Sequence, residues 1–141
     1  MSSEMDELED MVMADARNTY SDTVIDHAMN PRNVGQIRDA DGFAKITGPC
    51  GDTMQIWVEV ENNVITNATF LTDGCGTSAA SGSMITEMSK GKSISHVQKV
   101  TQKDVLSALG GLPEDSTHCA LLAANTIKAA IKAYKAIKQE S

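Results

Sequence analysis

Residues 53–72 read TMQIWVEVENNVITNATFLT, and this stretch decides the fold. Apolar and polar residues alternate through its first half, which is the pattern of a β-strand with one buried face. The pair Asn62-Asn63 suits the positive backbone angles of a two-residue turn. Residues 64–72 then form the return strand, and residues 43–47 form a shorter strand before the hairpin. The sequence therefore predicts a sheet of three antiparallel strands.

A two-residue turn also predicts which residues of the hairpin face each other. If the strands continue in that register, Gln55 faces Phe70 and, beyond the strand ends, Cys50 falls opposite Cys75. Facing Cα atoms of antiparallel strands are about 4.5–5.5 Å apart. A β-bulge would shift the partners by one residue, but the two strand ends would stay together. We therefore expect both thiols at one end of the sheet.

Helical spacing of apolar residues appears on both sides of the strands. Ser21 is a good N-cap for a helix that ends before Pro31. Four later helices are predicted at residues 77–90, 93–96, 101–110 and about 117–138. The predicted fold class is α+β, with a three-stranded antiparallel sheet packed against several helices and a long C-terminal helix.

Length, charge and composition exclude several classes of protein. A chain of 141 residues predicts one domain, at residues 20–141, after an acidic extension at residues 1–19 that is expected to be mobile in part. The net charge of −7 and the few aromatic residues argue against a nucleic-acid partner. No apolar run is long enough to span a membrane. Three cysteines without an export signal favour free thiols in the cytoplasm.

The three cysteines are the candidate functional residues. Cys50 lies within Gly-Pro-Cys-Gly-Asp, Cys75 lies between two glycines, and Cys119 follows His118. Because buried cysteines have no need of such neighbours, each thiol is predicted to be exposed and reactive. Cys75 directly precedes a predicted helix and Cys119 lies in the first turn of another, where the helix dipole favours the thiolate.

Three thiolates with one further donor match a tetrahedral zinc site or an iron–sulfur cluster. Asp52 and His118 are the candidates for that fourth position. The cysteines come from three separate loops without a paired C-x-x-C, which is unlike a zinc finger. Carboxylate is a harder and weaker ligand for iron than thiolate, so the site is predicted to hold a cluster reversibly. That favours delivery of a cluster over electron transfer.

Four separated motifs resemble those of the IscU/NifU-type iron–sulfur cluster assembly scaffolds. The resemblance runs from residue 20 to about residue 138, and its motifs are YS, VIDH and NPRNVG near the start, then GPCGD, GCG, and LP shortly before HCA. It implies a scaffold, and not an enzyme, on which a [2Fe–2S] cluster is built from iron and sulfur. A pyridoxal-phosphate cysteine desulfurase would supply the sulfur as persulfide, and apo iron–sulfur proteins would receive the cluster.

The resemblance also implies roles for particular residues. By position, Cys50, Cys75 and Cys119 are cluster ligands, and Cys119 is the expected persulfide acceptor. Asp52 and His118 compete for the fourth place, and Asp52 would tune the lability of the cluster. Zinc is expected as a possible occupant of the cluster-free form. A homo-oligomer, with the cluster within one subunit or between subunits, is left open.

Residues 112–116 depart from the family pattern. They read LPEDS where relatives served by a dedicated Hsp70 chaperone carry Leu-Pro-Pro-Val-Lys, which argues against that chaperone as a partner. An alternative function is a zinc-bound sulfurtransferase that accepts persulfide on Cys119 from a desulfurase. The SufU-type proteins that represent this alternative carry an insertion that this chain lacks. A Cys–His hydrolase is disfavoured because adjacent helical residues point about 100° apart, which would place His118 badly as a base for Cys119.

Overall fold

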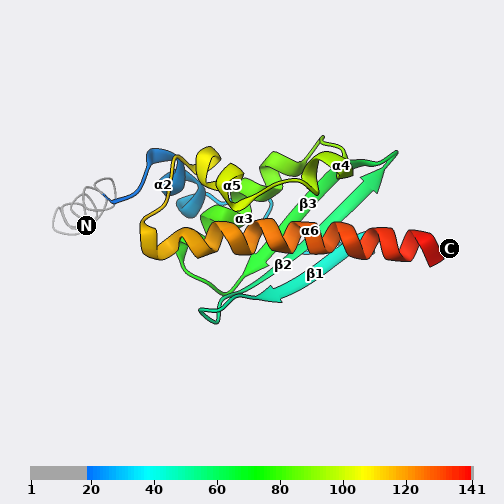
Figure 1. Cartoon of the computed structure of the whole chain (residues 1–141), viewed down its shortest axis with the longest axis horizontal. Coiled ribbons are helices and arrows are strands. Elements are labelled where there is room, and N and C mark those ends of the chain that lie inside the picture. The colour runs from blue at the N-terminus through cyan, green and yellow to red at the C-terminus, as the bar shows by residue number, and fades with distance from the viewer. Residues whose placement is uncertain (1–18, 141) are drawn as a thin grey trace, which may run out of the picture.

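The structure is a computed structural model that describes residues 19–140 of the chain. The predicted acidic extension therefore lies almost entirely outside the described residues. Figure 1 shows one antiparallel sheet with the long C-terminal helix running across its strands. The strands are β1 (Gly42–Thr47), β2 (Thr53–Glu61) and β3 (Val64–Thr72), in the spatial order β1-β2-β3. The predicted fold class and strand number are confirmed.

The turn of the β2–β3 hairpin has the predicted conformation. Asn62 and Asn63 have φ angles of 54° and 64°, in the left-handed region that two-residue hairpin turns require. Glu61 and Val64 face each other across the turn, as the sequence predicts. The carbonyl of Asn63 also accepts a hydrogen bond of 2.9 Å from the N–H of Ile94, which ties the turn to the following helices.

The predicted register fails further along the hairpin. It shifts at a bulge between Glu59 and Val60, so that Gln55 faces Leu71 and not Phe70. The bulge adds a residue to one strand, and every later partner moves by one position. The prediction of a direct Cys50–Cys75 pair is therefore wrong in its register. Both residues still lie beyond the same end of the sheet, because β2 starts after Cys50 and β3 ends before Cys75.

The helices follow the predicted caps and breaks. Ser21 Oγ accepts a hydrogen bond of 3.0 Å from the N–H of Val24, and Thr101 forms a capping box with Asp104. Gly110 ends its helix with a φ of 77°. The helices are α2 (Asp22–Met29), α3 (Gly76–Ser89), α4 (Ile94–Val97), α5 (Gln102–Leu109), the 3-10 helix η1 (Glu114–Ser116) and α6 (Thr117–Glu140). No helix among these described residues is long and apolar enough to cross a membrane.

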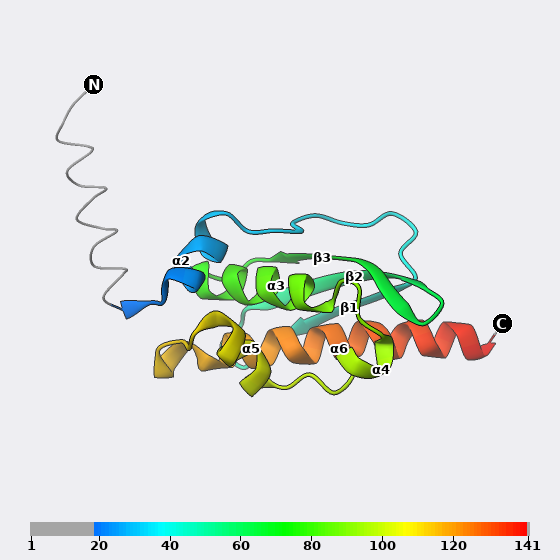
Figure 2. The ribbon, with the colours of Figure 1, turned by 90° about the horizontal axis from the view of Figure 1, so that it is seen from above.

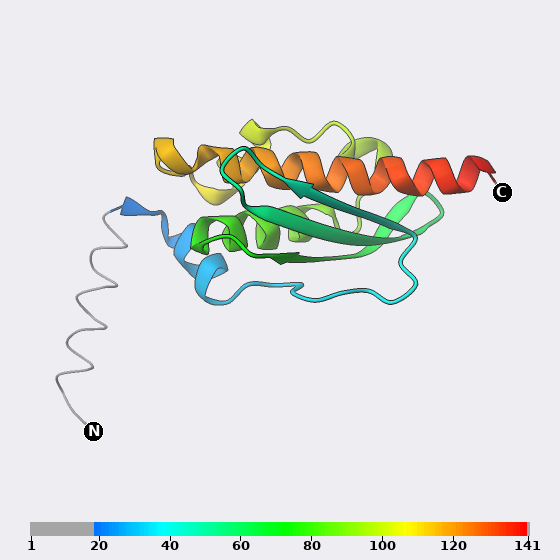
Figure 3. The ribbon, with the colours of Figure 1, turned by 90° about the horizontal axis from the view of Figure 1, so that it is seen from below.

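The core lies between the sheet and two helices. Helix α6 packs on β1 and β2, α3 packs on β3, and α5 contacts both α3 and α6. Figures 2 and 3 show this layering from opposite sides, with the connection from α2 to β1 running past the β3 side of the sheet. The N–H of Gly35 in that connection donates to the carbonyl of Phe70 at 3.0 Å. Side chains that fill the core include Met54, Ile56, Val58, Phe70, Ile85, Ala123, Ile127 and Ile131.

Candidate metal centre

Three chain segments carry the candidate ligands to one end of the molecule. Cys50 lies in the turn between β1 and β2, where the N–H of Gly51 donates to the carbonyl of Gly48 at 3.0 Å. Cys75 is the N-cap residue of α3, and Cys119 lies in the first turn of α6. Figure 1 shows the β1–β2 connection and the first turns of α3 and α6 at the same end. The three segments therefore lie at one end of the molecule, and the contacts between their side chains are described below.

A single hydroxyl group connects two of the thiols. Oγ1 of Thr77 lies 3.0 Å from Sγ of Cys75 and 3.4 Å from Sγ of Cys119. Thr77 is buried, whereas Cys75 is exposed. The hydroxyl therefore lies between an outer thiol and an inner thiol. Since a hydroxyl has one proton and two lone pairs, it can donate to one sulfur while it accepts from the other.

A second hydroxyl connects the inner thiol to the carboxylate. Oγ of Ser78 donates a hydrogen bond of 2.9 Å to Oδ2 of Asp52 and lies 3.4 Å from Sγ of Cys119. Gly74 leaves the space for this arrangement. A Cβ atom on Gly74 would lie 2.6 Å from Cβ of Ser78 and 2.9 Å from Oδ2 of Asp52, which are distances that real Cβ atoms do not adopt. One glycine of the GCG motif is thus explained by close packing.

His118 completes a group of three ligand types. Its Nε2 lies 3.6 Å from Sγ of Cys119, and one ligand atom each from Asp52, His118 and Cys119 lies within 4.8 Å of the others. Although adjacent helical residues point about 100° apart, the His118 imidazole comes within hydrogen-bond distance of the Cys119 thiol. Imidazole nitrogen, carboxylate oxygen and thiolate sulfur are all ligands of zinc and of iron. The geometry makes both proposed fourth donors available.

Cys119 is buried, which contradicts the prediction that all three thiols are exposed. Its residue surface is 1% exposed, while Cys50 and Cys75 are both exposed. Cys119 lies four residues before Ala123 and eight before Ile127, both of which are fully buried on α6. Residues at these spacings share one face of a helix. The burial of Cys119 thus follows from the apolar stripe of its own helix.

The environment of Cys75 favours its thiolate. The Thr77 hydroxyl lowers the pKa of the Cys75 thiol most, and the amide groups of Ser78 and Thr77 lower it further, while partial burial opposes the shift. These amides point toward the sulfur from the start of α3, without forming a regular N-cap hydrogen bond. The shift agrees in direction with the predicted effect of the helix N-terminus.

Cys50 stands apart from these contacts. It is exposed on its turn, and no hydrogen bond of its thiol is recorded among residues 19–140. The hydroxyls of Thr77 and Ser78, by contrast, take part in the site although the sequence motifs did not identify them as site residues. The available signal was their place in the first turn of a helix that begins directly after a cysteine.

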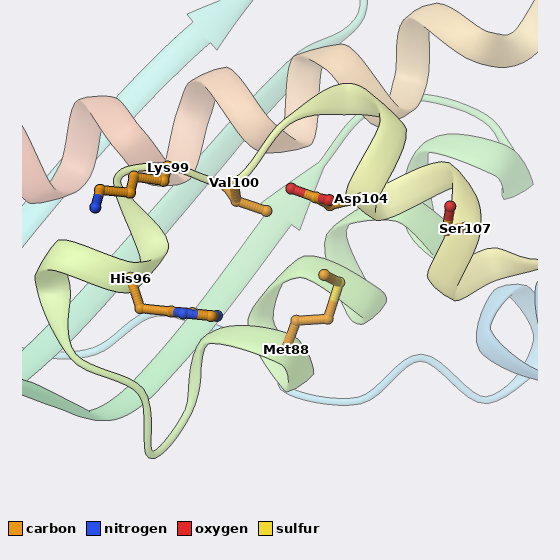
Figure 4. A pocket seen from close by; sticks show the side chains of 6 residues that line it. All are labelled: Met88, His96, Lys99, Val100, Asp104 and Ser107. Atoms are coloured by element: carbon orange, nitrogen blue, oxygen red, sulfur yellow. The ribbon is translucent and has the colours of Figure 1, made fainter.

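A cleft of about 510 Å³ lies near the far end of α3 and contains none of the three thiols. Figure 4 shows its lining side chains, which come from α3, α5 and the segment around α4. The carboxylate of Asp104, at its edge, accepts a hydrogen bond from the N–H of Thr101 in the capping box. The lining residues are Met88, His96, Lys99, Val100, Asp104 and Ser107. This cleft is therefore separate from the site that contains the thiols.

Comparison with known proteins defines the class of protein. The chain matches the NifU-like N terminal domain over residues 19–141 and belongs to that family. It is 49% identical over 116 residues to the iron-sulfur cluster assembly scaffold protein IscU 1 of Archaeoglobus fulgidus, which covers 82% of this chain and 76% of the relative. It is 42% identical over 125 residues to the scaffold protein IscU of Escherichia coli K12, covering 85% of this chain and 97% of the relative. The resemblance found in the four motifs is confirmed.

Solved structures share the fold. A NifU-like N-terminal protein from Brucella abortus superposes with a TM-score of 0.68 at 17% identity, covering 82% of this chain and 94% of that one. A SufU protein from Fervidobacterium islandicum gives a TM-score of 0.64 at 20% identity, covering 79% of this chain and 96% of that one. At these identities the likeness concerns the arrangement of the sheet and helices.

Proposed function

We propose that this protein is a scaffold on which an iron–sulfur cluster is assembled and from which the cluster passes to apo-proteins. The observation that supports this most is the group formed by Asp52, His118 and Cys119, whose ligand atoms lie within 4.8 Å of one another. The Thr77 hydroxyl joins Cys75 to the same group. The sequence identity to relatives that are named IscU scaffold proteins supports the same proposal.

The ligand set suits a cluster held for a limited time. We propose a [2Fe–2S] cluster, with Cys50, Cys75 and Cys119 as thiolate ligands and Asp52 or His118 as the fourth donor. Cys50 and Cys75 are exposed, so the cluster would lie at the surface, where a recipient protein can reach it. A carboxylate or an imidazole in place of a fourth thiolate makes the iron easier to release.

Sulfur would arrive as persulfide from a cysteine desulfurase. In that exchange the outer sulfur atom moves to an acceptor thiolate and the donor thiolate is released. Cys119 is the proposed final acceptor, but its 1% exposure means that an incoming persulfide meets Cys50 or Cys75 first. Sulfur would then reach Cys119 by a second exchange or after an outward movement of the first turn of α6. Free thiols throughout fit a reducing cytoplasm.

Zinc is the proposed occupant of the cluster-free form. Asp52, His118 and Cys119 supply three donor types that zinc accepts in tetrahedral sites. The same group supports the alternative function, a zinc-bound sulfurtransferase that never builds a cluster. The two functions differ in what the protein holds after incubation with iron and a sulfur source.

Anaerobic reconstitution tests the proposal. Purified protein is incubated with iron(II), cysteine, a cysteine desulfurase and a thiol reductant, and its visible absorption and iron content are followed. We expect the absorption bands of a [2Fe–2S] cluster, with strong losses in the single variants Cys50→Ser, Cys75→Ser and Cys119→Ser. Ser89→Ala, a buried change at the other end of α3, is the matched control and should retain the bands. Tightly held zinc with full sulfur acceptance and no cluster would favour the sulfurtransferase.

A further inference from the structure

Helix α3 carries six buried hydroxyl side chains, and three of them bond within the helix. Ser81 donates to the carbonyl of Thr77 at 2.8 Å, Thr86 to that of Gly82 at 2.8 Å, and Ser89 to that of Ile85 at 2.7 Å. Such bonds to the preceding turn satisfy a buried hydroxyl without reference to the rest of the fold. Ser78 is different, because its hydroxyl leaves the helix and donates to the carboxylate of Asp52.

The contacts of Ser78 fix the direction of its hydrogen bonds. Ser78 is fully buried and has one hydroxyl proton, which the Asp52 carboxylate accepts at 2.9 Å. Toward Sγ of Cys119, at 3.4 Å, the same oxygen can then only accept. The bond from Ser78 to Asp52 thus holds a half-buried carboxylate beside a buried thiol.

We propose that Ser78 is a positioning residue, which holds Asp52 in place for metal binding and so sets how tightly the site holds a metal ion. The inference rests on the proposed function only in taking Asp52 as a metal ligand. Hydrogen bonds to ligating carboxylates orient them, and removal of such a partner typically weakens metal binding about 10–100-fold. Gly74 contributes to this arrangement, since a Cβ atom there would clash with both Ser78 and Asp52.

Zinc titration of the cluster-free protein, in competition with a chromophoric chelator, tests the role of Ser78. We expect Ser78→Ala to raise the Kd for zinc about 10–100-fold. In an Asp52→Ala background the same substitution should change the Kd by less than about twofold, because the residue through which Ser78 acts is gone. Ser89→Ala removes a buried hydroxyl from the same helix, far from the site, and should leave the Kd unchanged.

Gly74→Ala gives an independent variant that keeps every ligand and every hydroxyl. Its added Cβ would lie 2.9 Å from Oδ2 of Asp52, so it should weaken zinc binding in the same direction as Ser78→Ala. Far-UV circular dichroism and thermal melts establish that each variant is folded, and Gly74→Ala provides the test should Ser78→Ala not fold.

Three results would overturn the inference. The first is an unchanged Kd in folded Ser78→Ala or, if that variant does not fold, in folded Gly74→Ala. The second is an equal loss of affinity from Ser78→Ala with and without Asp52, which would mean that Ser78 acts by another route. The third is a wild-type protein that assembles a cluster but binds no measurable zinc. Failure of cluster assembly with the predicted zinc pattern intact would instead overturn the proposed function alone.

Discussion

Oγ1 of Thr77 lies 3.0 Å from Sγ of Cys75, and this contact is the largest cause that lowers the pKa of the Cys75 thiol. A hydroxyl that donates to the sulfur favours the thiolate over the neutral thiol. The residue after the GCG motif thus contributes to the reactivity of its cysteine. The exposed position of Cys75 lets this effect be measured directly.

Replacement of Thr77 by valine should raise the pKa of the Cys75 thiol, because the donor to the thiolate is removed and the side-chain shape is kept. The measurement is the pH profile of alkylation at Cys75, read by mass spectrometry, and the profile should move to higher pH. Thr77→Ser keeps the hydroxyl and should stay close to wild type. An identical profile for Thr77→Val would show that the hydroxyl does not tune this thiol.

The hairpin turn that fixes the strand ends should be sensitive to the residue at position 63. Asn63 has a φ of 64°, a conformation that β-branched residues adopt at a cost of about 1–3 kcal/mol. Asn63→Val should lower the free energy of unfolding by about that amount in urea denaturation. Asn63→Gly is the control and should be tolerated, since glycine adopts this conformation freely. Equal stability of the two variants would contradict the assigned turn.

Gly82 should not accept a side chain, although alanine is the better helix former. A Cβ atom there would lie 2.6 Å from Cε2 of Phe70, whose side chain is only 2% exposed. Overpacking costs about 1–3 kcal/mol and outweighs the helical preference of alanine, about 1 kcal/mol. Gly82→Ala should therefore lower the urea midpoint.

Gly76 provides the matched comparison on the same helix. A Cβ atom at Gly76 would meet only Cβ of Ala28, at an ordinary contact distance of 3.7 Å. Gly76→Ala should leave stability unchanged or raise it slightly. If Gly82→Ala were as stable as Gly76→Ala, the close packing of α3 on β3 would be refuted.

His27 should make folding less stable in mild acid. Its Nδ1 lies 2.7 Å from Oγ of Ser83, and burial lowers its pKa below 6.5, with the Arg32 charge acting in the same direction. The folded protein then binds a proton less readily than the unfolded chain. The stabilising contribution is present above the unfolded pKa and is lost as the pH falls through the lower folded value.

The His27→Gln variant tests this dependence. Between about pH 7 and about pH 5, its urea midpoint should fall less than that of wild type. The exposed His96 serves as the control, and His96→Gln should follow the wild-type decline. If the urea midpoint of His27→Gln fell as steeply as that of wild type, His27 would not be the cause of the lower stability in acid.

Most of the fold could be predicted from short stretches of the sequence. The alternation from Met54 onward predicted β2, and Asn62-Asn63 predicted its turn, because each depends on a few adjacent residues. At the bulge, Glu59 and Val60 of β2 are adjacent but their partners Asn67 and Ile65 are two residues apart, so β3 carries one extra residue, and no glycine marks it. Register beyond such a point is set by packing and hydrogen bonds across the strands, which a single strand pattern does not contain.

The candidate ligands could be named from the sequence, but their surroundings could not. Glycine, histidine and aspartate beside the cysteines pointed to metal chemistry, and that pattern is local. The burial of Cys119 depends on which face of α6 meets α3. Its four-residue spacing to the buried Ala123 could have indicated that burial. The bond from Ser78 to Asp52 joins residues 26 positions apart and follows only from the assembled fold.

Transfer of an assembled cluster tests the central claim most directly. Reconstituted protein, freed of excess iron and sulfide, is mixed with an apo-ferredoxin in the presence of an iron chelator, and circular dichroism follows the cluster on each protein. A temporary carrier should lose its cluster signal as the ferredoxin signal appears, with little iron captured by the chelator. A cluster that stays on this protein throughout, or reaches only the chelator, would contradict the account.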